Sequence, residues 1–421
     1  NAEAKIAQCI LLGVGGAKLL EALNFNPDVY HLNEAHALPA AFYLYSKWGN
    51  LEAVRQKLVF TTHTPDPGGN EIHNIHLLKK LNFFSGLELD TIREITHLEG
   101  NSFNHTLAGL RLARIANGVS KLHGEVARQM WGGYDYICPI SHVTNSQETE
   151  YWTDTYLDEA AAQNEIEVLK TRKAELKKRL FKTVADQTGK LFDPKVLTIV
   201  WARRFAAYKR ADLLTEDMQA FERLINDQDR PIQWIWAGKP YPKDHGAIAI
   251  FNKLINLSKK YPNVAVLTGY ELDLSAQTKK GSDVWLNTPR VTREASGTSG
   301  MTAAMNASVN LSTNDGWIPE FAKPGVNAFI VPEVARSSNH DVQDTHDRMH
   351  FFRLIEQEIK PMYYDQPEKW WQLVRQSMHD VKQFFDSKRM ATEYYTKMFP
   401  ADAATRAEIP NVGNEGVSAS G

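Results

Sequence analysis

The amino-acid sequence predicts an α/β protein built on parallel sheets, and three observations carry this prediction. From position 196 onward, short apolar runs alternate with helix-forming stretches. The runs are almost continuously apolar, which is typical of strands buried on both faces of a parallel sheet. Each run ends in Gly or a polar residue, at the strand end where such sheets bind ligands. The expected strands are Val196–Ala202, Ile232–Ala237, Val264–Leu267, Val284–Leu286 and Val309–Ser312.

The first part of the chain carries the same signal over fewer strands. Expected strands are Val29–Leu32, Leu58–Phe60 and Tyr136–Ile140, and Leu110–Trp131 is among the helical segments between them. We expect an α/β domain over residues 1–146, a second domain over 147–400 and a mobile tail over 401–421. Within the second domain, Glu159–Ala185 has a helix-forming composition, and the aromatic-rich segment Arg353–Phe399 also favours helix.

Composition narrows the classes of function. A formal net charge of -2 argues against a general nucleic-acid binder, which would be basic. The two cysteines, Cys9 and Cys138, form neither a disulfide framework nor a CxxC pair, which favours a reducing compartment. No apolar run is long enough to cross a bilayer, so we expect no membrane partner.

A small-residue loop lies between the run Val284–Leu286 and the helix-forming stretch Ala303–Ala307. From Arg293 to Thr302 it is Arg-Glu-Ala-Ser-Gly-Thr-Ser-Gly-Met-Thr. The order strand, loop and helix lets backbone N–H groups converge on an anion, and the helix N-terminus adds partial positive charge. A helix N-terminal carboxylate is the plain structural explanation of Glu294.

Four cations crowd into residues 203–210, namely Arg203, Arg204, Lys209 and Arg210. A solvated basic helix start would explain them. However, cations oppose the dipole at a helix N-terminus unless an anion binds there. The segment therefore predicts either a solvated helix start or a phosphate site.

Histidines and acids gather after two expected strands of the first domain. His31, Glu34, His36 and His63 offer zinc-ligand chemistry, but their spacing is not HExxH. A structural hydrogen-bonding role is the commoner outcome for any one of these histidines, and we expect no metal.

Several strings together resemble the α-glucan (glycogen, starch and maltodextrin) phosphorylase family over roughly residues 6–399. They are the loop 293–302, the basic segment 203–210, Thr61–Thr64, His31–His36 and the string Asn117–Glu125. Asp315–Gly316–Trp317 is similar to the shorter bacterial and archaeal branch. The resemblance implies two Rossmann-like domains of the GT-B type facing a cleft, with the first domain incomplete at its N-terminus.

The resemblance also implies roles for individual residues. Arg204 and Lys209 would hold the substrate phosphate, and His63 would lie beside the scissile sugar. Sugar binding would involve Glu34, His36, Asn145 and Glu294, and the backbone of Ala295, Ser296 and Gly297. Arg203, Tyr270 and Thr298 would contact the family's cofactor, pyridoxal phosphate.

Thr302 stands where the family has the lysine that binds pyridoxal phosphate as a Schiff base. A hydroxyl cannot form an imine, so any cofactor here is not covalent. In the family the cofactor acts through its phosphate group. Loss of the lysine thus removes the tether and not the catalytic group itself.

The implied activity is transfer of a terminal α-1,4-linked glucosyl unit to inorganic phosphate, which yields glucose 1-phosphate. The partners would be an α-glucan and phosphate in the cytoplasm, and a homo-oligomer is compatible with the resemblance. Two alternatives stay open: a cofactor-free GT-B glycosyltransferase that uses a nucleotide-sugar, and a non-catalytic glucan-binding homologue.

Overall fold

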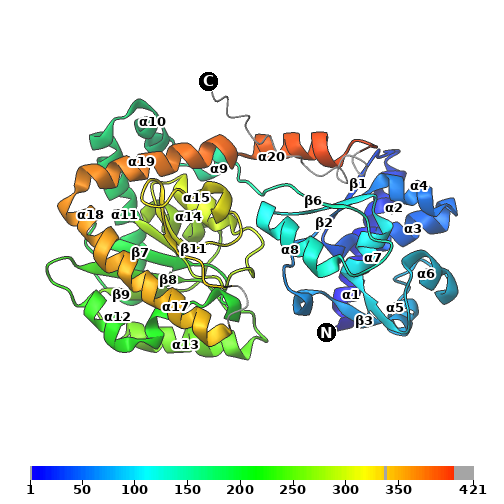
Figure 1. The fold of residues 1–421 in the computed structure, drawn as a ribbon, viewed down its shortest axis with the longest axis horizontal. Helices are drawn as coiled ribbons and strands as arrows, with labels where there is room; N and C mark the ends of the chain where they lie inside the picture. Colours follow the sequence, from blue (N-terminus) through cyan, green and yellow to red (C-terminus); the bar gives the residue numbers. More distant parts are fainter. Residues whose placement is uncertain (1, 336–338, 403–421) are drawn as a thin grey trace, which may run out of the picture. The chain divides into compact units, whose positions relative to one another are not determined.

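The computed structural model describes residues 2–335 and 339–402, so the expected tail lies outside the described residues except at 401–402 (Figure 1). The chain divides into two compact units. Unit 1 consists of residues up to Val143 and the segment from Ala391 onward, and unit 2 consists of Thr144–Met390. Each unit has a parallel sheet with helices packed on it, which confirms the predicted α/β class.

The sheet of unit 2 has six described strands, all parallel, in the order β12-β11-β10-β7-β8-β9. Their bounds are β7 Leu197–Ala202, β8 Ile232–Ala237, β9 Val264–Leu267, β10 Val284–Asn287, β11 Val309–Thr313 and β12 Ala328–Val331. Five of them match expected apolar runs, and β12 was not predicted. The order changes direction at β7 and β10, the position where open α/β sheets bind ligands.

Both faces of this sheet are covered, as the continuous apolar runs predict. Alternate strand residues such as Trp201 and Trp234 enter one core, together with side chains of α12 (Met218–Ile225) and α13 (His245–Ser258). The opposite residues, such as Trp285, pack with side chains of α11 (Ile166–Thr188), α14 (Leu272–Gly281) and α15 (Thr298–Ala304). The other described α-helices of unit 2 are α9 Thr149–Trp152, α10 Thr155–Gln163, α16 Ile318–Phe321, α17 His340–Arg353, α18 Lys360–Asp365 and α19 Pro367–Phe384.

Unit 1 contains a parallel sheet in the order β1-β2-β5-β6. Its strands are β1 Tyr30–Asn33, β2 Leu58–Thr61, β5 Ile115–Gly118 and β6 Ile140–His142. A separate antiparallel pair is formed by β3 (Ile72–Asn74) and β4 (Ser102–Asn104). The α-helices before the domain crossing are α1 Ala2–Ile10, α2 Gly16–Ala22, α3 Pro39–Trp48, α4 Leu51–Lys57, α5 Ile75–Lys80, α6 Leu89–Thr96, α7 His105–Leu112 and α8 Lys121–Trp131.

Two expected helices are interrupted. The stretch 110–131 contains the end of α7, strand β5 and α8, because Ile115–Gly118 is wholly buried between β2 and β6 and pairs with both. The stretch 159–185 contains a break at Asn164, whose φ of 61° caps α10 before α11 begins. Local composition favoured helix in both places, and tertiary pairing or a left-handed cap overrode it.

The chain returns to unit 1 within α20 (Ser387–Glu393). Arg114 donates hydrogen bonds to the carbonyl groups of Met398 and Phe399, and the Tyr394 ring lies 5.0 Å from the His31 ring. These contacts hold the helical turn Tyr394–Met398 against unit 1. Among the described helices, none combines the length and the apolar character that a membrane span requires.

Candidate functional site

Two cations meet one carboxylate at the carboxyl ends of β7 and β10. Lys209 Nζ lies 3.2 Å from Glu294 Oε2, and Arg203 Nη1 lies 3.4 Å from the same oxygen. Arg203 directly follows β7, and Glu294 lies in the loop after β10. Because β7 and β10 are neighbours in a parallel sheet, the loops that follow them converge at one edge. The fold therefore joins the two segments that the sequence singled out separately.

The Arg203 guanidinium is held by side chains from several segments. It donates a hydrogen bond to Asn287 Oδ1 at the end of β10 and lies 3.5 Å from Ser299 Oγ. The residue is only 6% exposed, and among the described residues its Nε has no hydrogen-bond partner. A buried donor without a partner costs about 1–3 kcal/mol. Arg203 Nε is therefore a donor that a bound anion can satisfy.

The other two cations of the basic segment differ from this pair. Arg210 donates to Asp344 Oδ1 at 2.7 Å and to Asp347 Oδ2 at 2.6 Å, so it is a structural ion-pair residue. Arg204 is exposed, and within the described part of the chain its guanidinium forms no hydrogen bond or ion pair. Arg204 is thus available to a ligand, whereas Arg210 is not.

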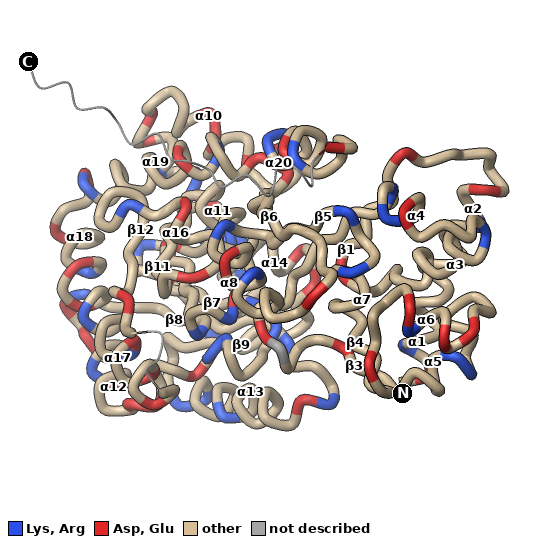
Figure 2. Tube along the Cα trace, turned by 45° about the vertical axis from the view of Figure 1, so that its right-hand side comes forward, with Lys and Arg blue, Asp and Glu red and all other residues tan. Residues whose placement is uncertain are grey.

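Residues 203–210 do not begin a helix, so the prediction that these four cations lie at a helix N-terminus is wrong. Ala207–Lys209 forms a single 3-10 turn, and α12 begins only at Met218. The case for an anion site rests instead on buried positive charge. Figure 2 shows Lys and Arg interspersed with Asp and Glu along both units. Burial, rather than a regional excess of charge, distinguishes Arg203 and Lys209.

Asp315 fixes the loop that carries Glu294. Its two carboxyl oxygens accept one hydrogen bond each, from the N–H groups of Glu294 at 2.9 Å and Gly316 at 2.8 Å. Trp317 N–H donates to Ser296 O at 3.0 Å, and a Cβ at position 316 would lie 2.3 Å from that oxygen. Gly316 also has a φ of 62°, so glycine is required there on two grounds. Sequence reasoning missed the roles of Asp315 and Asn287; their place at strand ends was the signal.

Burial shifts two titrating groups of this site toward their neutral forms. It raises the pKa of Asp315 to about 8, against the effect of the two backbone N–H donors. It lowers the pKa of Lys209, although the Glu294 carboxylate opposes that shift. At neutral pH a group with a pKa of about 8 is mostly protonated, so Asp315 adds little negative charge beside Arg203 and Lys209.

Position 302 does not fit a covalently bound pyridoxal phosphate. Thr302 is fully buried on α15, and its hydroxyl donates to Ser299 O at 3.0 Å. Asn306 Nδ2 donates to Thr302 O at 2.7 Å and to Trp152 O at 3.0 Å. An imine needs an amine, and the hydroxyl that replaces it already has a partner inside the protein.

A different buried amine, that of Lys279, lies against Trp152, the residue whose carbonyl accepts a hydrogen bond from Asn306. Lys279 Nζ lies 3.9 Å from the centroid of the Trp152 ring, and the residue is 5% exposed. Burial lowers the pKa of Lys279 to about 8. The Lys279 ammonium has no hydrogen bond or carboxylate partner among the described residues, so the ring face is its main electrostatic contact.

The other residues expected at the cofactor position lie on unit 2 as well. The Tyr270 hydroxyl is 3.2 Å from Ala202 O and 3.3 Å from Ser275 Oγ, and burial raises its pKa. Thr298 is the first residue of α15, directly after Gly297, whose φ is 89°. Ser296 Oγ is buried and, like Arg203 Nε, has no hydrogen-bond partner among the described residues. Ala295 lies between Glu294 and Ser296 in the same loop.

Unit 1 carries a second constellation, centred on Glu34. Its Oε1 accepts hydrogen bonds from the His63 backbone N–H, from Thr62 Oγ1 at 3.2 Å and from Thr64 Oγ1 at 3.3 Å. Glu34 has a φ of 59° and a ψ of -176°, a conformation that non-glycine residues adopt at a cost of roughly 1–3 kcal/mol. Strain of this kind persists where the surrounding structure imposes it, and it is concentrated at functional sites.

The histidines of unit 1 are held by hydrogen bonds. His63 Nε2 lies 2.7 Å from Asn33 Oδ1, and burial lowers the pKa of His63. His31 Nε2 lies 2.6 Å from Thr61 Oγ1, and burial lowers the pKa of His31 to about 4. His36 lies in the 3-10 turn Ala35–Ala37, next to Glu34. The structure thus brings Glu34 and His63 together at the ends of β1 and β2.

Asn145 lies at the start of unit 2, between Thr144 and Ser146. Its carbonyl is 3.5 Å from Arg389 Nη2, and Thr144 Oγ1 donates to Glu320 Oε2 at 2.7 Å. The expected sugar contact of the Asn145 side chain remains a prediction.

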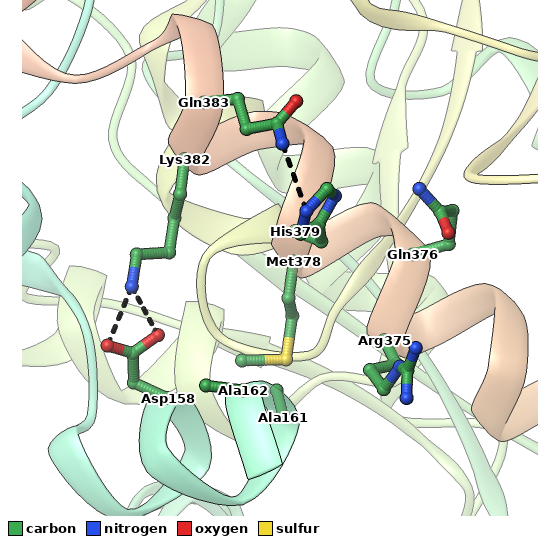
Figure 3. A pocket seen from close by; sticks show the side chains of 9 residues that line it. All are labelled: Asp158, Ala161, Ala162, Arg375, Gln376, Met378, His379, Lys382 and Gln383. Carbon is green, nitrogen blue, oxygen red and sulfur yellow. Dashed lines mark hydrogen bonds and ion pairs between the residues drawn. The ribbon is translucent and has the colours of Figure 1, made fainter. Parts of the chain in front are cut away.

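A pocket between α10 and α19 is separate from these residues. Figure 3 shows Lys382 donating to both carboxylate oxygens of Asp158, at 2.5 and 2.7 Å, and Gln383 beside His379. None of the expected site residues lines this pocket.

The family model described as carbohydrate phosphorylase matches residues 141–324. The chain is 44% identical to an uncharacterized protein of Methanocaldococcus jannaschii, over 94% of this chain and 73% of that protein. It is 32% identical to maltodextrin phosphorylase of Thermococcus litoralis and 30% identical to glycogen phosphorylase of Aquifex aeolicus. These two matches cover 94% of this chain and 53% and 66% of the respective proteins.

The chain belongs to the α-glucan phosphorylase family, as its motifs predicted. It spans roughly half to three quarters of the length of the relatives named above.

Proposed function

We propose that this chain is a phosphorylase-type glycosyltransferase that transfers a terminal α-1,4-linked glucosyl unit to inorganic phosphate. The observation that carries the proposal is the buried contact of Arg203 and Lys209 with Glu294, in a chain of this family. Arg204, Lys209 and Arg203 supply the positive charge for a phosphate. Glu294 and the adjoining loop backbone supply acceptors and donors for sugar hydroxyls.

In the proposed reaction an oxygen of phosphate forms a bond to the anomeric carbon of the terminal glucose. The bond from that carbon to the glycosidic oxygen breaks, and this oxygen takes the proton carried by the hydrogen phosphate. The products are glucose 1-phosphate and a glucan shortened by one unit. The cations hold the phosphate oxygens, and charge-assisted hydrogen bonds of this kind are about twice as strong as neutral ones.

Unit 1 is proposed to bind the glucan through the group around Glu34 and His63. The strained Glu34 backbone and its three hydrogen-bond donors support this assignment. His36 and Asn145 are assigned to the sugar by family resemblance. The two units are proposed to be the two Rossmann-like domains of a GT-B enzyme, acting in the reducing cytoplasm, where the unpaired cysteines Cys9 and Cys138 are stable.

Pyridoxal phosphate, which the family uses, is not proposed as a covalent group in this chain. Thr302 offers no amine, and its hydroxyl is bonded to Ser299 O. When bound in the family, the cofactor supplies a phosphate group beside the substrate phosphate. In this chain Arg203, Tyr270 and Thr298 are the residues left to contact it without a tether.

The test is an assay of the complete protein with maltooligosaccharide and phosphate, with and without added pyridoxal phosphate. Release of glucose 1-phosphate is expected. Arg204→Ala and Lys209→Ala should each reduce the rate of release by at least about tenfold, because each variant loses one contact to the phosphate. Lys239→Ala, in an exposed ion pair with Glu271, is the matched control and should retain activity. No release under either condition would contradict phosphorolysis.

A second candidate function is glycosyl transfer from a nucleotide-sugar, and the hydroxyl at position 302 favours it, since that reaction needs no imine. The basic segment would then hold a diphosphate. Hydrolysis or transfer of a nucleotide-sugar, blocked by Lys209→Ala, would support it. Glucan affinity that survives Lys209→Ala, with neither activity, would support a non-catalytic glucan-binding protein.

A further inference from the structure

Unit 1 contains a cluster of two histidines and one glutamate that lies outside the residues of the proposed phosphate and sugar sites. Glu71, His73 and His105 each direct a ligand atom into one small volume, and these atoms all lie within 4.8 Å of one another. His73 Nδ1 is 2.9 Å from His105 Nε2. None of its members belongs to the group His31, Glu34, His36 and His63, whose side chains also offer zinc-ligand chemistry.

The strand pair β3–β4 explains why these three side chains meet. Ile72 pairs with Asn104 in antiparallel register, so Glu71 lies opposite His105, and His105 N–H donates to Glu71 O at 3.0 Å. His73 is two residues beyond Glu71 and therefore points to the same face of the pair. Backbone hydrogen bonds thus fix all three positions before any ligand binds.

Ring packing further restricts the most buried member of the cluster. His105 is 2% exposed, and its ring lies 5.2 Å from the rings of both Phe83 and Phe103. His73 and Glu71 are half-buried, so the cluster opens toward solvent on their side. A cation entering from that side meets ligand atoms that the fold already holds close together.

We propose that Glu71, His73 and His105 bind a divalent cation of the zinc type, which pins the β3–β4 pair to the start of α7. Zinc prefers imidazole nitrogen and carboxylate oxygen at about 2.0–2.2 Å in tetrahedral geometry, which places neighbouring ligand atoms about 3.4 Å apart. The two ring nitrogens need to separate by only about half an ångström to reach that spacing. The ring that donates the hydrogen bond between them must move its proton to its other nitrogen.

Lys5 competes with the cation for the carboxylate. Its ammonium on α1 forms an ion pair with Glu71, and the Lys5 side chain is 54% exposed. A bound dication therefore has to displace a monovalent partner that is free to swing into water. This arrangement makes a prediction specific to the proposal: Lys5→Met should strengthen metal binding, whereas loss of a ligand should weaken it.

The test uses the full chain stripped of metal with a chelator and titrated with zinc chloride by calorimetry. One zinc per chain is expected, with a rise in the thermal midpoint of unfolding, because a ligand bound only to the folded state stabilises it. Cobalt(II) chloride in place of zinc should give the intense visible absorption of a tetrahedral site. Glu71→Gln and His73→Ala should each weaken zinc binding at least about tenfold, since loss of even a supporting group costs 10–100-fold.

His76→Ala is the matched control, because His76 is an exposed histidine three residues from His73 and outside the cluster. It should bind zinc as the unchanged chain does. Both ligand variants change half-buried side chains, and circular dichroism verifies that they fold. The proposal is overturned if zinc does not bind at one per chain, if Glu71→Gln and His73→Ala bind it unchanged, or if Lys5→Met weakens it.

Discussion

Replacing Glu294 with glutamine tests the charge balance of the proposed phosphate site. Glu294 is the carboxylate that Arg203 and Lys209 share, and the side chains are 13%, 6% and 13% exposed respectively. Glutamine keeps the shape but removes the negative charge, which leaves two buried cations uncompensated. Removing one partner of a buried ion pair costs about 3–5 kcal/mol. We expect about 3 kcal/mol, because Arg203 keeps its hydrogen bond to Asn287.

For a unit of the size of Thr144–Met390, a loss of about 3 kcal/mol lowers the thermal midpoint by about 6–12 °C. Phosphate should reverse most of this loss, because the anion replaces the missing charge. At 100 times its dissociation constant a ligand stabilises by about 2.7 kcal/mol. The midpoint of Glu294→Gln should therefore rise more with phosphate than the midpoint of the unchanged protein, in which Glu294 repels the anion.

The assay is thermal unfolding with and without phosphate at constant ionic strength. Glu271→Gln is the matched control: it makes the same chemical change in the exposed pair with Lys239, which is worth at most about 1 kcal/mol. Equal stabilisation of Glu294→Gln and the unchanged protein by phosphate would refute the reasoning, as would a midpoint loss no larger than the control's.

Three further predictions concern single buried groups of unit 2. Treatment with pyridoxal phosphate and borohydride should leave position 302 unlabelled in the unchanged chain and label it in Thr302→Lys; mass spectrometry of the peptide decides. In the unchanged chain the free energy of unfolding should rise by up to about 3 kcal/mol between pH 8 and 10.5, because over this range Lys279 binds a proton in the unfolded chain but not in the folded one. Lys279→Met should abolish this rise. Urea titrations across this pH range measure the rise, and an unchanged rise in the variant would contradict the prediction. Asp315→Asn should cost about 1–3 kcal/mol in urea unfolding, because Glu294 and Gly316 donate to different oxygens of Asp315 and the amide nitrogen that replaces one of them cannot accept; no loss would contradict that role.

Much of the unit 2 sheet could be predicted from sequence, because its strands are short apolar runs with polar ends. Val284–Leu286 and Ile232–Ala237 match β10 and β8 to within one residue. Strand β5 could not be recognised in the same way. Ile115–Gly118 lies between two helix-forming segments, and only its pairing with β2 and β6 makes it a strand.

The sequence singled out the segments around Arg203 and Glu294, but it did not predict the contact between them. The pairing of Arg203 with Glu294, 91 positions apart, follows from strand order, which local spacing does not reveal. The cations were expected at a helix start, and they lie instead beside a 3-10 turn with a carboxylate between them. Arg210 looks equivalent to Lys209 in the sequence, but two aspartates of α17 bind it.

The charges of the proposed phosphate site in unit 2 favour a doubly charged anion. Arg203, Arg204 and Lys209 contribute three positive charges, and Glu294 removes one. Asp315 adds no full negative charge near neutral pH, because burial raises its pKa to about 8. The remaining two positive charges match hydrogen phosphate. As pH rises past about 8, ionisation of Asp315 reduces this excess, and loss of a proton from Lys209, whose pKa burial lowers, reduces it further. Phosphate affinity measured by calorimetry should therefore fall with rising pH, although free phosphate remains a dianion; an affinity that rises would mean that these residues do not hold the anion.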